Sequence, residues 1–112
     1  MNKTDNLTIK QCKPCEGGMA PLSDSEADNL MQQLDGWQRH DQLLQKIFPF
    51  KNYYLTIAFV NAVAWLSHRE DHHPELTVGY NSCRVEYTTH AINGLSENDF
   101  ICAAKVDSLF KL

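Results

Sequence analysis

Four of the five histidines of this chain lie close together in the sequence, and a proline directly follows the adjacent pair: they are His68, His72, His73 and His90, with Pro74. Histidine has an unperturbed pKa near neutral, so it can donate or accept a proton without large tuning. Because the residue before a proline disfavours helical geometry, we expect the pair to lie where a helix stops. The cluster therefore indicates proton chemistry on a small molecule.

The elements around this cluster could bring the histidines to one cleft. If helical geometry persists to the pair, His68 and His72 lie one turn apart on the same face. His90 is expected to end a strand of the following hairpin, and antiparallel pairing can place that end beside the strand that starts after Pro74. A single histidine at a helix end more often only interacts with the helix dipole, so the prediction depends on the joint arrangement.

The first half of the chain predicts a helix and a hairpin. The helix begins at Ser23, which with Glu26 makes a capping box, and it stops at Gly36. The hairpin spans Trp37 to Phe50, turns near Asp41-Gln42 and has Pro49 at a strand end or edge. The inward stripe of the helix is expected to be Ala27, Leu30, Met31 and Leu34.

The second half predicts a long helix, a second hairpin and a last helix. The long helix runs from Asn52 to Ser67 or His68, with Trp65 packed, and its inward stripe is Leu55, Phe59, Ala62, Val63 and Leu66. The hairpin turns at Asn81-Ser82, and its buried face carries Leu76, Val78, Tyr80, Cys83, Val85 and Tyr87. The other face of its second strand carries Arg84, Glu86, Thr88 and His90. The last helix starts at a Ser96–Asp99 capping box and ends near Leu112, with Phe100, Ala103, Val106 and Phe110 inward.

This order of elements predicts an α+β fold with two layers: a four-stranded antiparallel sheet with three helices packed on one face. Residues 1–21 are polar and contain Gly17-Gly18, so they are expected to form an irregular N-terminal arm ahead of a single domain at residues 22–112.

Bulk composition excludes several classes of function. A net charge of −4 without clustered Lys or Arg argues against nucleic acid as the main ligand. The longest uncharged segment, Asn52 to Ser67, is too short to span a bilayer. The polar start of the chain leads into no apolar run, so no signal peptide is expected. The location is therefore expected to be cytoplasmic, and the cysteines are expected to be reduced thiols.

A metal site is the competing chemical interpretation. Cys12-x-x-Cys15 together with two histidines would complete a tetrahedral zinc set. Adjacent histidines rarely bind one ion together, and the spacing of the remaining residues is a poor match, so no metal is expected. Asp99 is explained as a helix cap, and Trp37 either belongs to the core or covers a flat ligand.

Several motifs together resemble the pterin-4a-carbinolamine dehydratase family, over residues 22 to 110. They are His68-x-x-x-His72-His73-Pro74-Glu75, Val78-x-Tyr80-Asn81, Val85-x-Tyr87-x-Thr89-His90 and Gly94-Leu95-Ser96-x-x-Asp99, with Gly36-Trp37 and Phe48-x-Phe50-Lys51 upstream. The resemblance implies the same α+β fold and association into dimers or tetramers.

The resemblance also implies a reaction, namely loss of water from a 4a-hydroxytetrahydropterin to give the quinonoid dihydropterin, in support of aromatic amino-acid hydroxylases. No redox change occurs, so no metal or organic cofactor is required. By resemblance, His72, His73 and His90 are the acid–base and substrate-orienting groups. The implied pocket is lined by Pro74, Trp37, Thr88 and Thr89, and Asp99 supports it or caps the helix.

One residue departs from the family pattern. Many members have a carboxylate where this chain has His68, and a neutral histidine offers one acceptor nitrogen instead of two oxygens. Two alternatives therefore stay open: a substrate that is another pterin or a related heterocycle, and a non-catalytic protein-binding or dimerisation cofactor of the same fold.

Overall fold

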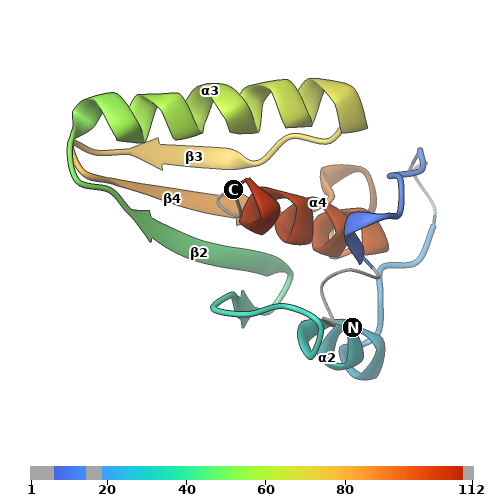
Figure 1. The fold of residues 1–112 in the computed structure, drawn as a ribbon. Helices are drawn as coiled ribbons and strands as arrows, with labels where there is room; N and C mark the ends of the chain where they lie inside the picture. The colour runs from blue at the N-terminus through green and yellow to red at the C-terminus, as the bar shows by residue number, and fades with distance from the viewer. Residues whose placement is uncertain (1–6, 15–18, 110–112) are drawn as a thin grey trace.

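The computed structural model describes residues 7–14 and 19–109, and it has the predicted α+β architecture of two layers (Figure 1). Along the chain the elements are α2 (Asp24–Met31), β1 (Gln38–His40), β2 (Leu43–Pro49), α3 (Tyr53–Glu70), β3 (Glu75–Val78), β4 (Ser82–Tyr87), the 3₁₀ turn η1 (His90–Ile92) and α4 (Glu97–Ser108). Phe110 and Leu112, predicted to belong to the last helix, lie outside the described residues.

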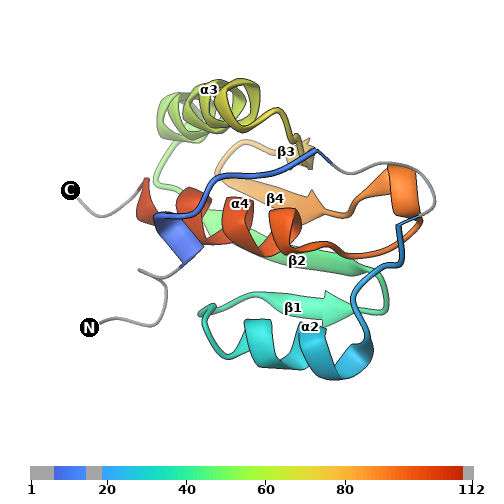
Figure 2. The same cartoon turned by 90° about the vertical axis from the view of Figure 1, so that its right-hand side faces the viewer.

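The sheet has four antiparallel strands in the order β1-β2-β4-β3, so the two predicted hairpins pair through β2 and β4. Along β4 the side chains alternate between buried and half-buried, with Cys83, Val85 and Tyr87 buried. This alternation confirms that one face of the sheet is covered, and the helices pack on that face (Figure 2).

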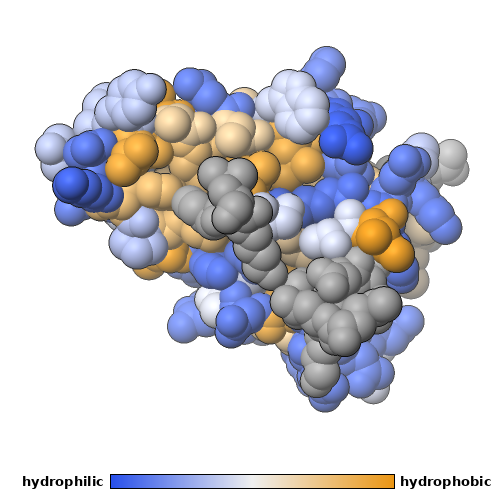
Figure 3. Space-filling view, viewed as in Figure 1, coloured by the Kyte–Doolittle hydropathy of each residue, from blue (hydrophilic) through white to orange (hydrophobic). Residues whose placement is uncertain are grey.

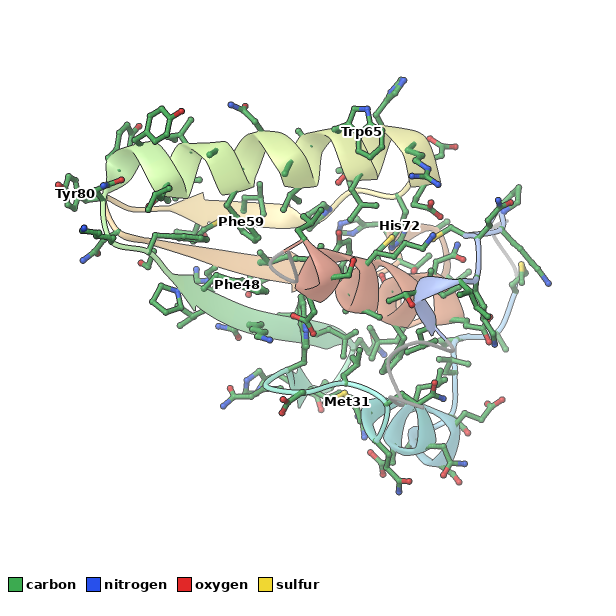
Figure 4. All side chains as sticks on the ribbon, viewed as in Figure 1. Met31, Phe48, Phe59, Trp65, His72 and Tyr80 are labelled. Carbon is green, nitrogen blue, oxygen red and sulfur yellow. The ribbon has the colours of Figure 1, made fainter. Side chains whose placement is uncertain are left out.

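Aromatic and aliphatic side chains between the two layers form the core. Phe48 on β2 and Phe59 on α3 have ring centroids 4.8 Å apart, which joins the long helix to the sheet (Figure 4). α4 is buried along most of its length, from Asn98 to Val106. Leu7 of the N-terminal arm is fully buried in the same core, and residues 7–14 run alongside α4 (Figure 2).

The first helix is shorter than predicted. α2 begins after Ser23, whose capping box with Glu26 is confirmed, but it ends at Met31. The N–H groups of Gln32, Gln33 and Leu34 donate to carbonyls three residues back, which tightens the chain out of α geometry before Gly36. Gly36 itself has φ of +81° and serves a bend that leads into β1.

The inward face of α3 is rotated from the predicted one. Leu55 is 41% exposed, and Thr56 is fully buried in its place, with its hydroxyl donating to the carbonyl of Tyr80. Trp65 was expected to pack, but it is 62% exposed and projects from the outer side of the helix (Figure 4). The guanidinium of Arg69 lies 5.5 Å from the Trp65 ring, a contact that a surface tryptophan can make.

The second hairpin differs from the prediction at its tip and at its end. Val78 and Tyr80 are exposed, because β3 is an edge strand and Tyr80 lies beyond it, stacked on Tyr53. β4 ends at Tyr87, so His90 does not end a strand but opens the 3₁₀ turn η1. An isolated bridge between Thr89 and Gly94 closes this turn.

The surface is not uniformly polar. Within the described residues, no helix combines the length and the apolar character needed to cross a bilayer. Apolar side chains (orange) nevertheless gather along α3, as Figure 3 shows, while hydrophilic side chains (blue) surround α2. The large hydrophobic residues exposed on α3 are Tyr53, Tyr54, Leu55 and Trp65.

Candidate active site

The histidine pair lies where α3 stops, as predicted. Asp71 adopts the left-handed conformation, with φ of 53°, and ends the helix after Glu70. The N–H of His72 donates back to the carbonyl of Ser67 over 3.2 Å, so the chain turns off the helix axis before β3 begins. The expected one-turn relation of His68 and His72 within a helix is therefore wrong, because helical geometry ends between them.

His72 is bound to a buried carboxylate. Its Nε2 lies 2.6 Å from Oδ1 of Asp99, a residue that is fully buried. Since a carboxylate oxygen accepts, the contact requires an N–H at Nε2 and leaves Nδ1 as the ring atom that can exchange a proton. The other oxygen, Oδ2, accepts from the hydroxyl of Thr89 over 2.7 Å and from the N–H of Ser96 over 2.9 Å. Asp99 thus caps α4 and holds a histidine at the same time.

The ring of His72 is fixed from a second side by Tyr87. The two rings are nearly parallel, at 8°, with centroids 5.7 Å apart. Burial raises the pKa of the Tyr87 hydroxyl, so this ring is a neutral wall at neutral pH. His72 therefore has one ring edge on Asp99 and one ring face on Tyr87, which defines its orientation.

Three of the hollows that the described residues form lie around the pair, and His73 lines each of the three. The largest has a volume of about 510 Å³ and also contacts Pro74, Thr88 and His90. The next, of about 480 Å³, is lined by His72, His73, Thr88, Thr89 and His90 together with Cys12, Lys13 and Pro14 of the arm. The third, of about 400 Å³, is lined by His68, His72, His73 and Pro74. Hollows of this size suit a small heterocycle.

The structure thus brings the predicted histidines together even though His90 lies in a 3₁₀ turn. Pairing of Glu75 with Glu86 places the start of β3 beside the end of β4, and the chain reaches His90 shortly afterwards. His68, His73 and His90 are exposed, so their rings are accessible to a ligand. The hydroxyl of Thr88 donates to the carbonyl of Gln42 over 2.6 Å, which fixes this wall of the hollow to the β1–β2 turn.

Trp37, which the resemblance implied would line the pocket, lies in the core. It is 6% exposed, its Nε1–H donates to Asp107 over 3.0 Å, and its ring packs against Phe48 and Tyr87. It is not among the residues that line the three hollows. Of the two readings of Trp37 from the sequence, the structure corresponds to the core residue and not to a cover for a ligand.

The expected C-x-x-C pair cannot be compared, because Cys15 lies outside the described residues. Cys12 contacts Cys102 of α4 instead, with the two sulfur atoms 3.4 Å apart. Among residues 7–14 and 19–109, no three His, Cys, Asp or Glu side chains are grouped closely enough to hold a metal ion.

Two buried polar residues beside the site were not predicted, namely Glu70 and Asn98. Burial on its own would raise the pKa of Glu70, but hydrogen bonds from the N–H of Cys12 and from Lys105 outweigh it, so the pKa lies below its ordinary value. Glu70 continues the buried face of α3 at helical spacing after Val63 and Ser67, and this spacing was the available sequence signal. Nothing local in the sequence points to the contact of Asn98 with the arm.

Comparison with known proteins agrees with this geometry. The family described as "Pterin 4 alpha carbinolamine dehydratase" matches residues 20–109. The chain belongs to the pterin-4a-carbinolamine dehydratase family. The match covers all the described elements from α2 to α4, and with them the histidine pair, His90 and Asp99.

Relatives in this family extend over nearly the whole chain. A protein of Nitrosospira multiformis, provisionally named a pterin-4-alpha-carbinolamine dehydratase, is 69% identical over 108 residues, with 96% of each chain covered. One of Nitrosomonas europaea with the same provisional name is 64% identical over 112 residues, with 99% of each covered.

Two solved structures of the family type have the same fold. The crystal structure of a transcriptional coactivator/pterin dehydratase from Brucella melitensis has a TM-score of 0.76 and 32% identity, covering 80% of this chain and 97% of that one. A pterin dehydratase-like protein, identified as a RuBisCO assembly factor in the alpha-carboxysome, has a TM-score of 0.55 and 30% identity, covering 65% of this chain and 84% of that one.

Proposed function

We propose that this chain dehydrates 4a-hydroxytetrahydropterin to the quinonoid dihydropterin by histidine acid–base catalysis. The observation that carries the proposal is the hollow lined jointly by His72, His73 and His90, with His72 held by the buried Asp99. Membership of the dehydratase family supports the substrate class.

The reaction matches what these side chains can do. Elimination breaks the bond between C4a and the hydroxyl oxygen, delivers a proton to that oxygen and removes a proton from a ring nitrogen. Atoms balance as one water and the quinonoid product, with no electron transferred. Such proton transfers need a donor and an acceptor within hydrogen-bond reach on the same ligand, which histidines from two elements of the fold provide.

We further propose how the substrate is held. Pro74, Thr88 and Thr89 form the walls nearest the catalytic histidines, and His68 lines the adjoining hollow. Because His68 replaces a carboxylate, the amino-pyrimidine edge of the pterin meets one acceptor nitrogen there. Turnover of pterins with different side chains measures how narrowly this pocket selects, and failure of every pterin to bind would refute a pterin role.

Stopped-flow absorbance with enzymatically generated 4a-hydroxytetrahydropterin tests the reaction. The wild type should accelerate dehydration over buffer, and the double variant His73→Ala/His90→Ala should lose about 10²- to 10⁴-fold in kcat. The matched control is His40→Ala, since His40 is exposed on β1 and its hydrogen bond is to Gln38 in the same strand. No acceleration by the wild type, or undiminished turnover by the double variant, would remove the proposal.

The product then leads to the wider role that we propose. Reduction of the quinonoid dihydropterin returns a tetrahydropterin, so the enzyme would support an aromatic amino-acid hydroxylase, in the cytoplasm and as a homodimer or homotetramer. Sedimentation velocity of the purified chain determines the assembly, and a monomer at all concentrations would contradict it.

A second candidate function is favoured by one observation, the exposed aromatic face of α3. Contiguous exposed apolar surface often marks a protein-binding site. Relatives of this fold include a transcriptional coactivator/pterin dehydratase and a RuBisCO assembly factor. A stable partner that is lost on Trp65→Ala, in a chain without dehydratase activity, would favour this function over the enzymatic one.

A further inference from the structure

Two cysteines that play no part in the proposed reaction meet beside the active-site hollow. Sγ of Cys12, on the N-terminal arm, lies 3.4 Å from Sγ of Cys102, on α4. Cys102 is fully buried, whereas Cys12 is half-buried and also borders a second hollow of about 410 Å³, which the arm lines together with Glu97. Both are free thiols in this structure.

Two buried polar side chains hold the arm so that the thiols meet. The amide of Asn98 accepts from the N–H of Lys13 over 2.9 Å and donates to the carbonyl of the same residue. The carboxylate of Glu70 accepts from the N–H of Cys12 over 3.1 Å. Asn98 and Cys102 are four residues apart on α4 and therefore lie on one helix face, along which the arm runs. The thiol contact is part of a fixed docking arrangement.

We propose that Cys12 and Cys102 are a redox modification site, at which a reversible disulfide locks the N-terminal arm onto α4. The oxidant that we name is hydrogen peroxide. The Cys12 thiolate attacks one peroxide oxygen, the O–O bond breaks, and the hydroxide that leaves takes up a proton to become water. Cys102 sulfur then attacks the sulfur of the Cys12 sulfenic acid, the S–O bond breaks, and the departing hydroxide takes the Cys102 thiol proton and leaves as a second water. Two thiols are oxidised and one peroxide is reduced to two waters.

The surroundings of each thiol indicate which step it performs: Cys12 reacts with the peroxide, and Cys102 then attacks Cys12. Cys12 lines two open hollows, so a small oxidant reaches it first. The hydrogen bond with Cys12 and then burial raise the pKa of the Cys102 thiol, which keeps Cys102 protonated and unreactive towards solvent. Cys102 acts only when its neighbour has become an electrophile.

The Cys12–Cys102 disulfide would also change the active-site hollow, because it fixes the arm that lines it. Cys12, Lys13 and Pro14 line the same hollow as His72, His73 and His90, so a fixed arm is a fixed wall of the pocket. This consequence rests on the proposed function, and it predicts a change in KM for the pterin substrate of at least about twofold with little change in kcat, as expected for uniform binding.

Peptide mapping of the full chain tests the disulfide without any activity measurement. The reduced chain is treated with hydrogen peroxide, remaining thiols are blocked with N-ethylmaleimide, and a digest is analysed by mass spectrometry. We expect one linked peptide pair, Cys12 with Cys102, and a rise in Tm of at least about 5 °C that dithiothreitol reverses, because the bond closes a long loop.

Single cysteine variants distinguish the Cys12–Cys102 disulfide from the alternative Cys12–Cys15 disulfide. Cys15→Ser and Cys83→Ser should keep the linked peptide and the rise in Tm, whereas Cys12→Ser should lose both. Cys12→Ser is preferred to a change at Cys102, since Cys12 is partly exposed and its replacement should not disturb the core. A Cys12–Cys15 linkage, or no linkage, would overturn the proposal. A linked chain without turnover would refute only the proposed function, and an active chain with equal KM in both redox states would refute the effect on the hollow.

Discussion

Two aspartates at opposite ends of α4, the fully buried Asp99 and the half-buried Asp107, have similar hydrogen bonds but different partners. Asp107 accepts from Nζ of Lys46 over 2.8 Å and from Nε1 of Trp37 over 3.0 Å. Asp99, about two turns earlier, accepts from a histidine, a threonine hydroxyl and a backbone N–H. Asp107 thus has a permanent cation as its partner, whereas the only titratable group bonded to Asp99 among the described residues is His72.

The difference separates a structural site from a chemical one. Lys46 also donates to the carbonyl of Asp35 and lies 5.0 Å from the Phe48 ring, so its cluster joins α4 to the sheet. His72, in contrast, lines the hollow, where a ligand can reach it. A buried carboxylate held by a titratable side chain at an open pocket is the arrangement expected of an active site.

Among substitutions in the two aspartate clusters, the largest effect on activity should come from Asp99→Asn. The amide no longer fixes the N–H of His72 at Nε2, so we expect kcat for pterin dehydration to fall by about 10²- to 10³-fold, or ~3–4 kcal/mol in the barrier. Stopped-flow absorbance measures this loss. The matched control is Asp107→Asn, on the same helix and with the same chemical change, which should keep kcat within about twofold of wild type. Equal losses of kcat in both variants would contradict the distinction between a structural Asp107 and an Asp99 that serves the reaction.

Glu70→Gln should give the largest loss of stability. It leaves the ammonium of Lys105, whose side chain is 12% exposed, without its carboxylate, so we expect about 3 kcal/mol lower free energy of unfolding in urea at pH 7. Because the pKa of Glu70 is lowered in the folded state, its contribution is present above the ordinary Glu pKa and is lost as pH falls through the folded value.

The difference between wild type and Glu70→Gln should therefore be largest at neutral pH and shrink below about pH 4.3. Urea titrations of both proteins across that range measure it. A difference that stays constant with pH would show that the carboxylate charge is not what stabilises this pair.

Asp107→Asn should cost about 2 kcal/mol of stability, because Lys46 loses its charged partner and the amide has only one acceptor oxygen for the two donors, Lys46 and Trp37. Urea denaturation measures the loss, and activity assayed well below Tm should be retained. Loss of activity in a fully folded Asp107→Asn would contradict the structural role assigned to this cluster.

Thr89→Val should have the smallest effect. It removes one of the two donors to Oδ2 of Asp99 without changing the volume of the side chain, and the N–H of Ser96 remains. We expect about fivefold lower kcat and ~1 kcal/mol lower stability. Thr89→Ser, which keeps the hydroxyl, should restore most of the activity. If Thr89→Val lowers kcat as much as Asp99→Asn does, the main role in holding His72 belongs to the Thr89 hydroxyl and not to the carboxylate.

Local patterns predicted the elements well where the chain itself sets the geometry. The capping box at Ser23, the two-residue turn at Asp41-Gln42 and the end of the long helix before Pro74 depend on neighbouring residues, and the structure contains all three. The predictions for Leu55 and Trp65 were wrong because an apolar helix has no polar face to mark its orientation, so the sheet decides which side is buried.

The sequence by itself determined the α+β fold and the dehydratase family, because alternating and helical patterns and a spaced set of histidines are local properties of the chain. Only the tertiary structure decided that Asp99 holds His72, that Trp37 pairs with Asp107, and that Cys12 meets Cys102. These partners are 27, 70 and 90 residues apart. No local pattern encodes such contacts, since they exist only once α4 is packed between the sheet and the arm.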